Sequence, residues 1–241
     1  MLTREELQQR IVTVRRRIGA AAARAGRDPA GITLVAVTKT QSPETVTLAY
    51  AAGLRVFAEN RVEEAGPKAE DVARLVAPAA PPVWHMIGHL QSRKARDVLP
   101  WAAMVHSVDS LKLAERLARL KVDPGRGEEG EPEPLDVLLE VNVSGEASKY
   151  GLTLGELPSV VEAVSTLKGI RLRGLMTMAP IVASPELARP TFAALRSVRD
   201  GLVREQHGID LRELSMGMTD DFEGAVEEGA TIVRIGRAIF G

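Results

Sequence analysis

Eight short apolar runs recur along the chain, and a segment with the composition of a helix follows each run except the last. The runs lie at residues 32–37, 54–58, 83–87, 104–106, 135–141, 172–176, 211–214 and 231–235. Such regular alternation predicts a parallel sheet with helices packed outside it. Eight strands in 241 residues favour a closed α/β fold, a single-domain (β/α)8 TIM-type barrel over residues 1–241. A doubly wound open sheet is the alternative fold.

Both ends of the chain depart from a simple barrel. Before the first run, residues 3–25 place apolar side chains at three- and four-residue steps, which predicts an amphipathic helix. Thr3 and Glu6 have the spacing of a capping box, and Gly26 can end the helix. After the last run, residues 236–241 leave room for only one helical turn. We therefore expect the extra N-terminal helix to cover that side of the barrel.

Residues 122–134 interrupt the alternation with a segment rich in Glu, Pro and Gly. This composition predicts a flexible insertion ahead of the fifth strand. An interdomain linker is the less favoured interpretation, because the alternation of strands and helices resumes unchanged after the segment.

The charge and cysteine content exclude several classes of function. Lys and Arg total 31 against 32 Asp and Glu, so the net charge of -1 provides no global attraction to nucleic acid or anionic lipid. The absence of cysteine excludes disulfides and thiolate metal ligands, and it fits a reducing compartment. Residues 1–17 are too charged for a signal peptide, and no apolar run approaches the roughly 20 residues that span a bilayer. We expect a cytoplasmic monomer without nucleic-acid or membrane partners.

The first apolar run leads directly to a lysine. Thr38 and Lys39 follow the run at 32–37, and Ser42 and Pro43 then supply the N-cap and first-turn residues of a helix. In α/β barrels the reactive groups lie at the carboxyl ends of the strands. We expect Lys39 to be partly desolvated there, a setting in which an amine is a usable nucleophile toward an aldehyde. The alternative is a lysine that simply extends into solvent.

Polar side chains follow several other strands, and two of the loops suit a phosphate. The polar set comprises Lys39, Asn60, His89, Gln91, Ser107, Asp109, Asn142 and Ser215. Phosphate groups in such barrels are usually held by the loops after the seventh and eighth strands, here 215–218 and 234–237. Ser215 offers a hydroxyl, and Gly236 lets backbone N–H groups approach an anion. A capping serine and a turn glycine would explain either loop alone, but together with Lys39 they favour a phosphorylated aldehyde.

The histidines give no comparable pattern. His85 and His89 have metal-ligand spacing only on a helix, whereas here they flank a strand end without a third ligand. We therefore expect no metal site. His106 shows no interpretable pattern.

Seven blocks of sequence carry a family resemblance, and they lie in one order from the first strand to the last residue. They are LVAVTKTQ, FAENRVEEA, WHMIGHLQSRKAR, VHSVDSLKLAERL, VLLEVNVSGEASKYGL, LRGLMTMAP and LSMGMTDDFEGAVEEGATIVRIGRAIFG. Together they resemble the pyridoxal phosphate homeostasis proteins, which are single-domain relatives of the fold-type III alanine racemases. The resemblance covers nearly the whole chain, and its long C-terminal block is the most specific.

The resemblance implies that the chain binds pyridoxal 5'-phosphate (PLP). Lys39 would form the Schiff base with it, Asn60 would lie near the ring, and Arg234 would face the pyridine nitrogen. Ala58 departs from the family pattern, which has a glycine at this position. We expect this departure to shift the neighbouring turn slightly.

The resemblance also implies how the phosphate is held. Ser215 and the backbone at Met216, Gly236 and Arg237 would contact it. Arg237 is the second departure, because the family has a small hydroxyl residue there. The replacement removes one hydroxyl contact and adds a positive charge, so affinity can move in either direction.

Members of this family bind PLP and help to control its free level and its supply to other enzymes, without established turnover. The resemblance thus implies a protein of intracellular PLP homeostasis, which buffers or carries the cofactor and has PLP-dependent apo-enzymes as partners. The alternative is a fold-type III amino-acid racemase. A racemase needs two acid–base groups, and Tyr150, after the fifth strand, is the candidate to act opposite Lys39.

Overall fold

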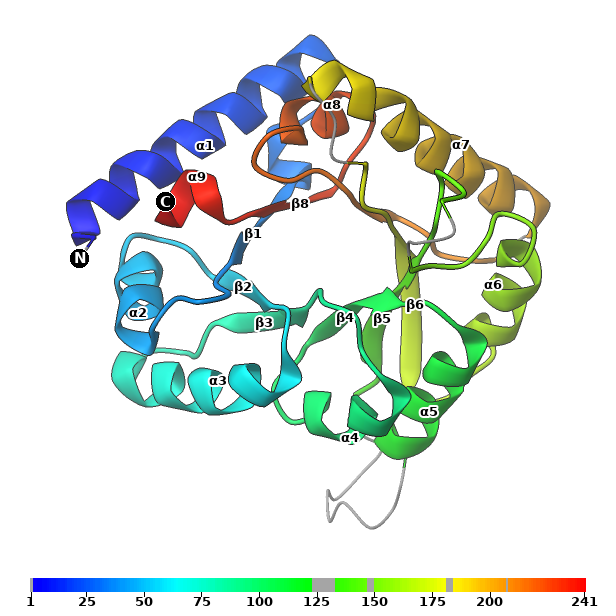
Figure 1. Cartoon of the computed structure of the whole chain (residues 1–241), viewed down its shortest axis with the longest axis horizontal. Coiled ribbons are helices and arrows are strands. Elements are labelled where there is room, and N and C mark those ends of the chain that lie inside the picture. The colour runs from blue at the N-terminus through cyan, green and yellow to red at the C-terminus, as the bar shows by residue number, and fades with distance from the viewer. Residues whose placement is uncertain (1, 123–132, 147–149, 181–183, 207) are drawn as a thin grey trace.

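Eight parallel strands pair in sequence order and close on themselves (Figure 1). The strands are β1 (Thr33–Val37), β2 (Val56–Glu59), β3 (Val83–Met86), β4 (Met104–Val108), β5 (Leu135–Glu140), β6 (Ile170–Met176), β7 (Glu213–Ser215) and β8 (Ile232–Ile235). β8 pairs with β1, where Val35 lies opposite Arg234 and Ala36 opposite Ile235. The predicted barrel is therefore confirmed, and the open sheet is excluded.

Helices surround the strands (Figure 1). The α-helices are α1 (Arg4–Arg24), α2 (Pro43–Ala51), α3 (Val62–Val76), α4 (Ala95–Val98), α5 (Leu111–Lys121), α6 (Leu157–Ser165), α7 (Arg189–Glu205), α8 (Phe222–Glu227) and α9 (Arg237–Phe240). Short 3-10 helices are η1 (Pro29–Gly31), η2 (Ser92–Lys94) and η4 (Pro185–Ala188).

This computed structural model describes residues 2–122, 133–146, 150–180, 184–206 and 208–241. The predicted insertion at 122–134 lies outside the described residues except at its two ends. Within the part of the chain that is described, no helix is both long and apolar enough to cross a membrane.

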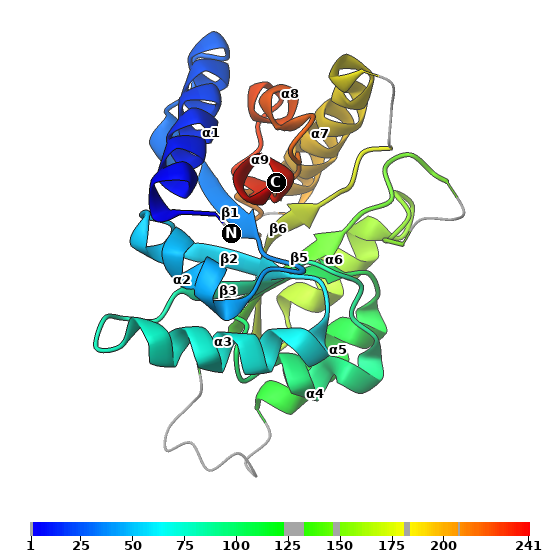
Figure 2. The ribbon, with the colours of Figure 1, turned by 60° about the vertical axis from the view of Figure 1, so that its left-hand side comes forward.

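α1 covers the side of the barrel that the short C-terminal helix leaves open (Figures 1 and 2). The predicted capping box is present, since Glu6 N–H donates to the Thr3 hydroxyl and Thr3 N–H donates to the Glu6 carboxylate. The apolar stripe of α1 is buried, and Arg10 donates to the Ile239 carbonyl of α9 at 3.2 Å. Because α9 has only four residues, α1 takes the place of a full eighth helix.

The predicted N-cap Ser42 is confirmed, whereas two other hydroxyl residues that precede helices do not act as caps. Ser42 caps α2 by accepting from Thr45 N–H. Ser184 makes no capping hydrogen bond, because the chain continues as the 3-10 helix η4 before α7 begins. Thr219 does not cap α8, which begins at Phe222 with Asp221 in the N-cap position; the Asp221 carboxylate accepts from Met218 N–H.

β4 extends further than the apolar run predicts. Ser107 and Val108 belong to the strand rather than to an exit turn, because Val108 pairs with Leu139 of β5 after a shift in register. The Ser107 hydroxyl donates to the Gly88 carbonyl at 2.6 Å, which ties β4 to the end of β3.

The core has two parts. A small cluster fills the barrel interior and consists of Val35, Ala58, Met104, Leu138, Met176 and Ile232. A larger aliphatic cluster lies between the strands and the helices. Ala58 is fully buried within β2, so its methyl group packs in the barrel interior. Its effect on the neighbouring turn stays a prediction.

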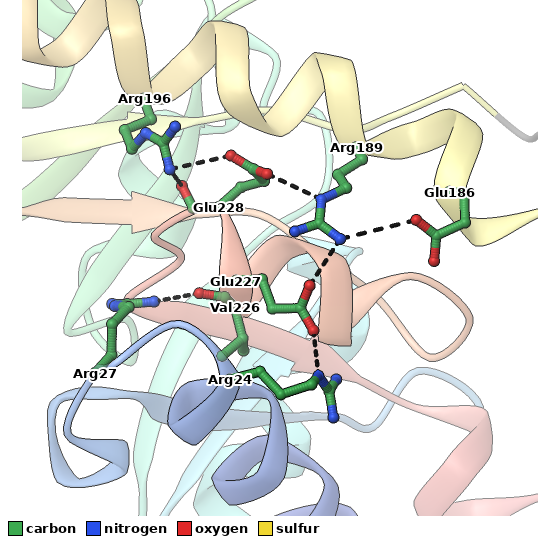
Figure 3. A network of polar contacts seen from close by, with 8 residues as sticks. All are labelled: Arg24, Arg27, Glu186, Arg189, Arg196, Val226, Glu227 and Glu228. Carbon is green, nitrogen blue, oxygen red and sulfur yellow. Dashed lines mark hydrogen bonds and ion pairs between the residues drawn. The ribbon is translucent and has the colours of Figure 1, made fainter.

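An ion-pair network joins α8 to the helices on either side of it (Figure 3). Glu227 contacts Arg24 of α1 and Arg189 of α7, both at 2.7 Å. Glu228 contacts Arg189 at 2.9 Å and Arg196 at 3.0 Å. The network therefore holds α8, which follows the loop after β7, between α1 and α7 (Figures 1 and 2).

Candidate functional site

A pocket of about 490 Å³ opens at the carboxyl ends of β1, β6, β7 and β8. Four of the seven predicted site residues line it, namely Lys39, Arg234, Gly236 and Arg237. The rest of the lining comprises Val37, Ala179, Pro180, Pro185, Met218, Thr219, Asp220 and Asp221. These residues are far apart in the sequence and meet because the strand ends of a closed parallel barrel share one face.

Lys39 lies in a tight turn directly after β1. Gln41 N–H donates to the Thr38 carbonyl at 2.9 Å, and Thr40 between them has a φ of +68°. The side chain of Lys39 is exposed rather than partly desolvated, so that expectation is wrong. Lys39 belongs to the turn that follows the strand rather than to the buried strand itself, and it lines the pocket from an exposed position.

A buried ion pair fixes the residue before Lys39. The Thr38 hydroxyl donates to Glu59 at 2.7 Å, and Lys68 donates both to Glu59 at 2.7 Å and to the Thr38 carbonyl at 3.1 Å. Both charged groups of this pair are almost fully buried. Two charge-assisted contacts, one to β2 and one to α3, therefore hold Thr38 at the start of the Lys39 turn, and the ion pair between Lys68 and Glu59 joins them.

Arg234 is the buried cation of the site, with 4% of its surface exposed. Its Nη1 donates to the Ser215 hydroxyl at 2.5 Å, and its Nη2 donates to the Thr177 carbonyl at 2.9 Å. Burial lowers the pKa of Arg234 to about 10, against the opposing effect of Glu140 and Asp221. The guanidinium thus remains charged at neutral pH while it lines the pocket.

Ser215 and Met216 are fully buried and are not among the residues that line the pocket. Ser215 contacts Arg234 and His106, and the N–H of Met216 donates to the Ile232 carbonyl at 3.1 Å. Met216 N–H is therefore already used within the barrel and is not a free donor for an anion. Ser215 reaches the pocket only through Arg234.

The loop after β8 leads at once into α9. The Thr219 hydroxyl accepts from Ala238 N–H at 3.4 Å, and the Arg237 guanidinium pairs with Asp220. Gly236 has an ordinary φ of −111°, and a Cβ there would lie at normal contact distance from Val37. Glycine is thus not required at this position by the turn itself.

Gly217 is the glycine that the pocket loops require. Its φ is +91°, and a Cβ at this position would lie 2.6 Å from the Cβ of Ala225 and 2.9 Å from the Cα of Phe222. The loop after β7 therefore packs on α8 only with a glycine here. Sequence reasoning did not single it out, because one glycine in a loop has no recognisable pattern.

Asn60 follows β2 and lies beside Lys39 in the barrel order, since Val37 pairs with Ala58. It lines a separate small pocket of about 190 Å³ together with His89 and Gln91. Its amide oxygen is buried and has no protein partner among the described residues. The structure therefore places Asn60 next to the Lys39 turn and not in the larger pocket.

His85 and His106 are buried polar residues of the barrel interior to which sequence reasoning assigned no role. His106 Nδ1 lies 2.9 Å from the Ser215 hydroxyl, and His106 Nε2 lies 2.9 Å from His85 Nδ1. Burial lowers the pKa of His85 to about 4 and holds that of His106 well below its usual value. Each histidine lies inside an apolar strand run, at 83–87 and at 104–106, and a polar residue in such a run was the signal that could have indicated a buried polar contact.

The two histidines with metal-ligand spacing have separate partners. His85 contacts His106, whereas His89 pairs with Asp109 at 3.1 Å and stacks on Tyr150 with ring centroids 3.9 Å apart. Across the described residues, no group of three or more His, Asp or Glu side chains is placed to hold a metal ion.

Glu140 is a buried carboxyl at the end of β5, with 4% of its surface exposed. Burial and the neighbouring Asp109 raise its pKa to about 7, against the opposing effect of Arg234. The carboxyl end of β5 therefore carries a buried carboxyl group, that of Glu140, whose pKa is close to neutral pH.

Comparison with known proteins gives one consistent result. The family model "Alanine racemase, N-terminal domain" matches residues 12–241. The pyridoxal phosphate homeostasis protein of Pseudomonas aeruginosa is 46% identical over 235 residues, which are 98% of this chain and 95% of that protein. Among solved structures, PipY of Synechococcus elongatus with PLP bound has a TM-score of 0.82 and 33% identity, covering 98% of this chain and 100% of PipY.

More distant structures share the fold alone. Alanine racemase from Corynebacterium glutamicum has a TM-score of 0.69 and 16% identity. The match covers 100% of this chain and 61% of that racemase.

Proposed function

The chain belongs to the pyridoxal phosphate homeostasis protein family, and we propose that it binds PLP in the pocket at the carboxyl ends of β1 and β8. Lys39 holds the cofactor as a Schiff base, and the protein buffers PLP and passes it to PLP-dependent apo-enzymes. The observation that carries this proposal is that Lys39 and Arg234 line one and the same pocket.

The pocket fits PLP in size and in chemistry. Its volume of about 490 Å³ falls within the range of about 300–1,000 Å³ that is usual for small-molecule sites. Bound PLP supplies an aldehyde and an electron-withdrawing pyridine ring. Lys39 provides the amine for the aldehyde, Arg234 provides a donor for the ring nitrogen, and the loop that begins α9 provides donors for the phosphate.

Arg234 supports binding without turnover. Its guanidinium stays charged at neutral pH, and Thr177 and Ser215 fix two of its nitrogen atoms. A permanent donor at the ring nitrogen keeps that nitrogen unprotonated and so limits the withdrawal of electrons by the ring. The ring is then a weaker electron sink, which slows the removal of an α-proton.

The exposure of Lys39 supports exchange of the cofactor. Release of PLP requires water or another amine to reach the bond that Lys39 makes. Because Lys39 lies at the pocket mouth and its side chain is exposed, both can approach it from solvent. A buried lysine would slow this exchange.

The phosphate is proposed to lie beside Gly236, Arg237 and Thr219. Gly236 and Arg237 begin α9, and Thr219 places a hydroxyl against the same turn. Ser215 acts on the ligand through Arg234, and Met216 contributes by packing. The pair between Arg237 and Asp220 neutralises much of the charge that Arg237 adds.

The test is covalent trapping. Purified protein is mixed with PLP, reduced with borohydride and digested, and we expect the modified peptide to contain Lys39. Lys39→Ala should lose the visible absorbance of bound PLP. Lys112→Ala, which removes an exposed lysine on α5, is the matched control and should bind as the parent does. Full absorbance in Lys39→Ala, with the label on another lysine, would refute the proposal.

The racemase alternative lacks the acid–base group that the sequence suggested for it. The pocket carboxylates are those of Asp220 and Asp221, of which Asp220 pairs with Arg237 and Asp221 accepts from Met218 N–H. Tyr150, the candidate from the sequence, is 57% exposed, stacks on His89 and is not among the lining residues. The cytoplasmic location and the monomeric state remain predictions.

A further inference from the structure

Four buried polar side chains form a continuous chain from the pocket into the barrel. Arg234 lines the pocket and contacts Ser215, Ser215 contacts His106, and His106 contacts His85. The three contacts measure 2.5, 2.9 and 2.9 Å. All four residues are buried, and the proposed function assigns no role to either histidine.

The hydrogen atoms of this chain can be placed by elimination. Arg234 has only donors, so the Ser215 oxygen accepts from it. The hydroxyl hydrogen of Ser215 then needs an acceptor, and the remaining contact of that hydroxyl among the described residues is His106 Nδ1. A buried hydroxyl without an acceptor is costly, so Nδ1 of His106 accepts.

This assignment fixes both imidazoles. If Nδ1 of His106 accepts, its hydrogen sits on Nε2 and is donated to Nδ1 of His85. His85 then carries its own hydrogen on Nε2. The scheme requires two neutral rings, and burial holds the pKa values of both histidines below their usual values.

We propose that His106 is a positioning residue for the PLP site: it accepts the hydroxyl hydrogen of Ser215, turns the serine lone pairs toward Arg234 and so fixes the guanidinium that faces the ligand. The inference rests on the proposed function in one respect, namely that the ligand of Arg234 is PLP. Without an acceptor at His106, the hydroxyl of Ser215 is free to rotate, and Arg234 keeps only the Thr177 carbonyl as a fixed partner.

The first experiment needs no ligand. In ligand-free protein labelled with ¹⁵N at histidine, we expect His106 to show an unprotonated Nδ1 and a protonated Nε2 at neutral pH. A protonated Nδ1 on His106 would overturn the proposal, whatever the protein binds. A failure of PLP binding, by contrast, would refute the proposed function. The ¹⁵N spectrum would still decide on which nitrogen of His106 the hydrogen lies.

The second experiment compares two variants of the same residue. Asparagine has a polar atom at the δ position, as histidine does, so His106→Asn can keep an acceptor for Ser215, whereas His106→Leu removes it. We expect His106→Leu to weaken PLP binding about tenfold or more and to shift the visible absorbance of bound PLP. His106→Asn should keep most of the parent's PLP affinity and visible absorbance. Equal defects in the two variants would contradict the proposal.

The third comparison separates positioning from a loss of structure. If His106 acts through Ser215, the difference in PLP affinity between His106→Asn and His106→Leu should vanish in a Ser215→Ala background. A difference that persists there would show that His106 affects the site by another route. If His106→Leu does not fold, the ¹⁵N spectrum of the parent protein still decides the hydrogen placement.

Discussion

Ser215 does not line the pocket itself but contacts Arg234, which does. The sequence places it in a phosphate-binding loop, but in the structure it is fully buried and bonded to Arg234 and His106. Its effect on binding should therefore pass through the guanidinium, which is proposed to face the ring and not the phosphate.

Ser215→Ala should weaken PLP and unphosphorylated pyridoxal to a similar degree. The variant removes one hydrogen bond to a charged group, worth about 1.5–3 kcal/mol, or about ten- to a hundredfold in affinity. Titrations of both ligands, followed by visible absorbance, measure the two losses. A loss confined to PLP would mean that Ser215 contacts the phosphate directly. An unchanged midpoint of unfolding in urea would exclude a damaged fold as the cause.

Thr40 holds a backbone conformation that its side chain disfavours. Its φ of +68° is one that asparagine adopts far more readily than a β-branched residue. We expect Thr40→Asn to stabilise the protein by about 0.5–1 kcal/mol in urea unfolding, because it relieves strain in the turn that carries Lys39. Thr40→Val keeps the β-branch and serves as the control without a gain. A loss of stability in the asparagine variant would show that the Thr40 hydroxyl outweighs the strain.

Glu140 should make stability fall as the pH rises through neutrality. Its pKa in the folded protein is about 7, above the ordinary 4.5, so the folded state binds more protons between these values. Ionisation above pH 7 then costs up to about 3 kcal/mol. Glu140→Gln removes this cost, so we expect it to exceed the parent in stability at pH 8 and to approach it at pH 5.

The comparison between Glu140→Gln and the parent isolates this carboxyl. His85 and His106 have lowered pKa values, so their contribution is lost as the pH falls below about 6.5 and runs in the opposite direction. The contribution of the histidines is common to both proteins, so it cancels in the difference between their free energies of unfolding. Urea unfolding of both proteins at several pH values between 5 and 8 measures this difference. A constant difference across this range would contradict the assignment.

At the scale of elements, α8 is the helix that an ion-pair network joins to two neighbouring helices. It is only six residues long, yet it closes the loop after β7 and packs on Gly217. Arg189 of α7 connects to both Glu227 and Glu228 (Figure 3). The two carboxylates are mostly buried, so their pairing is worth more than that of an exposed surface pair.

Arg189→Ala should destabilise the protein by about 1–2 kcal/mol in urea, and the loss should shrink at high salt. Arg74→Ala is the matched control, because Arg74 pairs with Asp71 on the exposed face of α3 and should matter by less than about 0.5 kcal/mol. Equal effects in the two variants would mean that the network around α8 adds nothing beyond an ordinary surface pair.

At the scale of the whole molecule, the barrel brings the Lys39 amine and the buried Arg234 guanidinium to one pocket, while Tyr150 is not among the lining residues. The racemase that shares the fold at 16% identity is longer, since the match covers 61% of it. We propose that this barrel binds the cofactor, and racemisation would need a further acid–base group positioned opposite Lys39.

Holo-protein incubated with L-alanine in D₂O should form no D-alanine at a steady rate. Removal of the α-proton on one face and its return on the other needs two positioned groups, and Lys39 supplies only one. Chiral chromatography and the deuterium content of the recovered alanine measure both steps. Rapid D-alanine formation that disappears in Tyr150→Phe would make the protein an enzyme and refute the carrier interpretation.

Local patterns determined much of this protein. The spacing of eight apolar runs predicted the barrel, and Thr3, Glu6 and Ser42 predicted their caps, because periodicity and capping depend on neighbours within a few residues. Lys39 and Arg234 were placed at one pocket because parallel strands in a barrel end on the same face.

Tertiary structure alone decided which polar groups meet inside that barrel. His106 contacts His85, 21 residues away, and Ser215, 109 residues away, through the register and closure of the strands. Burial, and with it the pKa of Glu140 and the exposure of Lys39, depends on everything packed around a group. Such contacts leave no local periodicity in the sequence, because the two partners lie on different strands and share only a position in space.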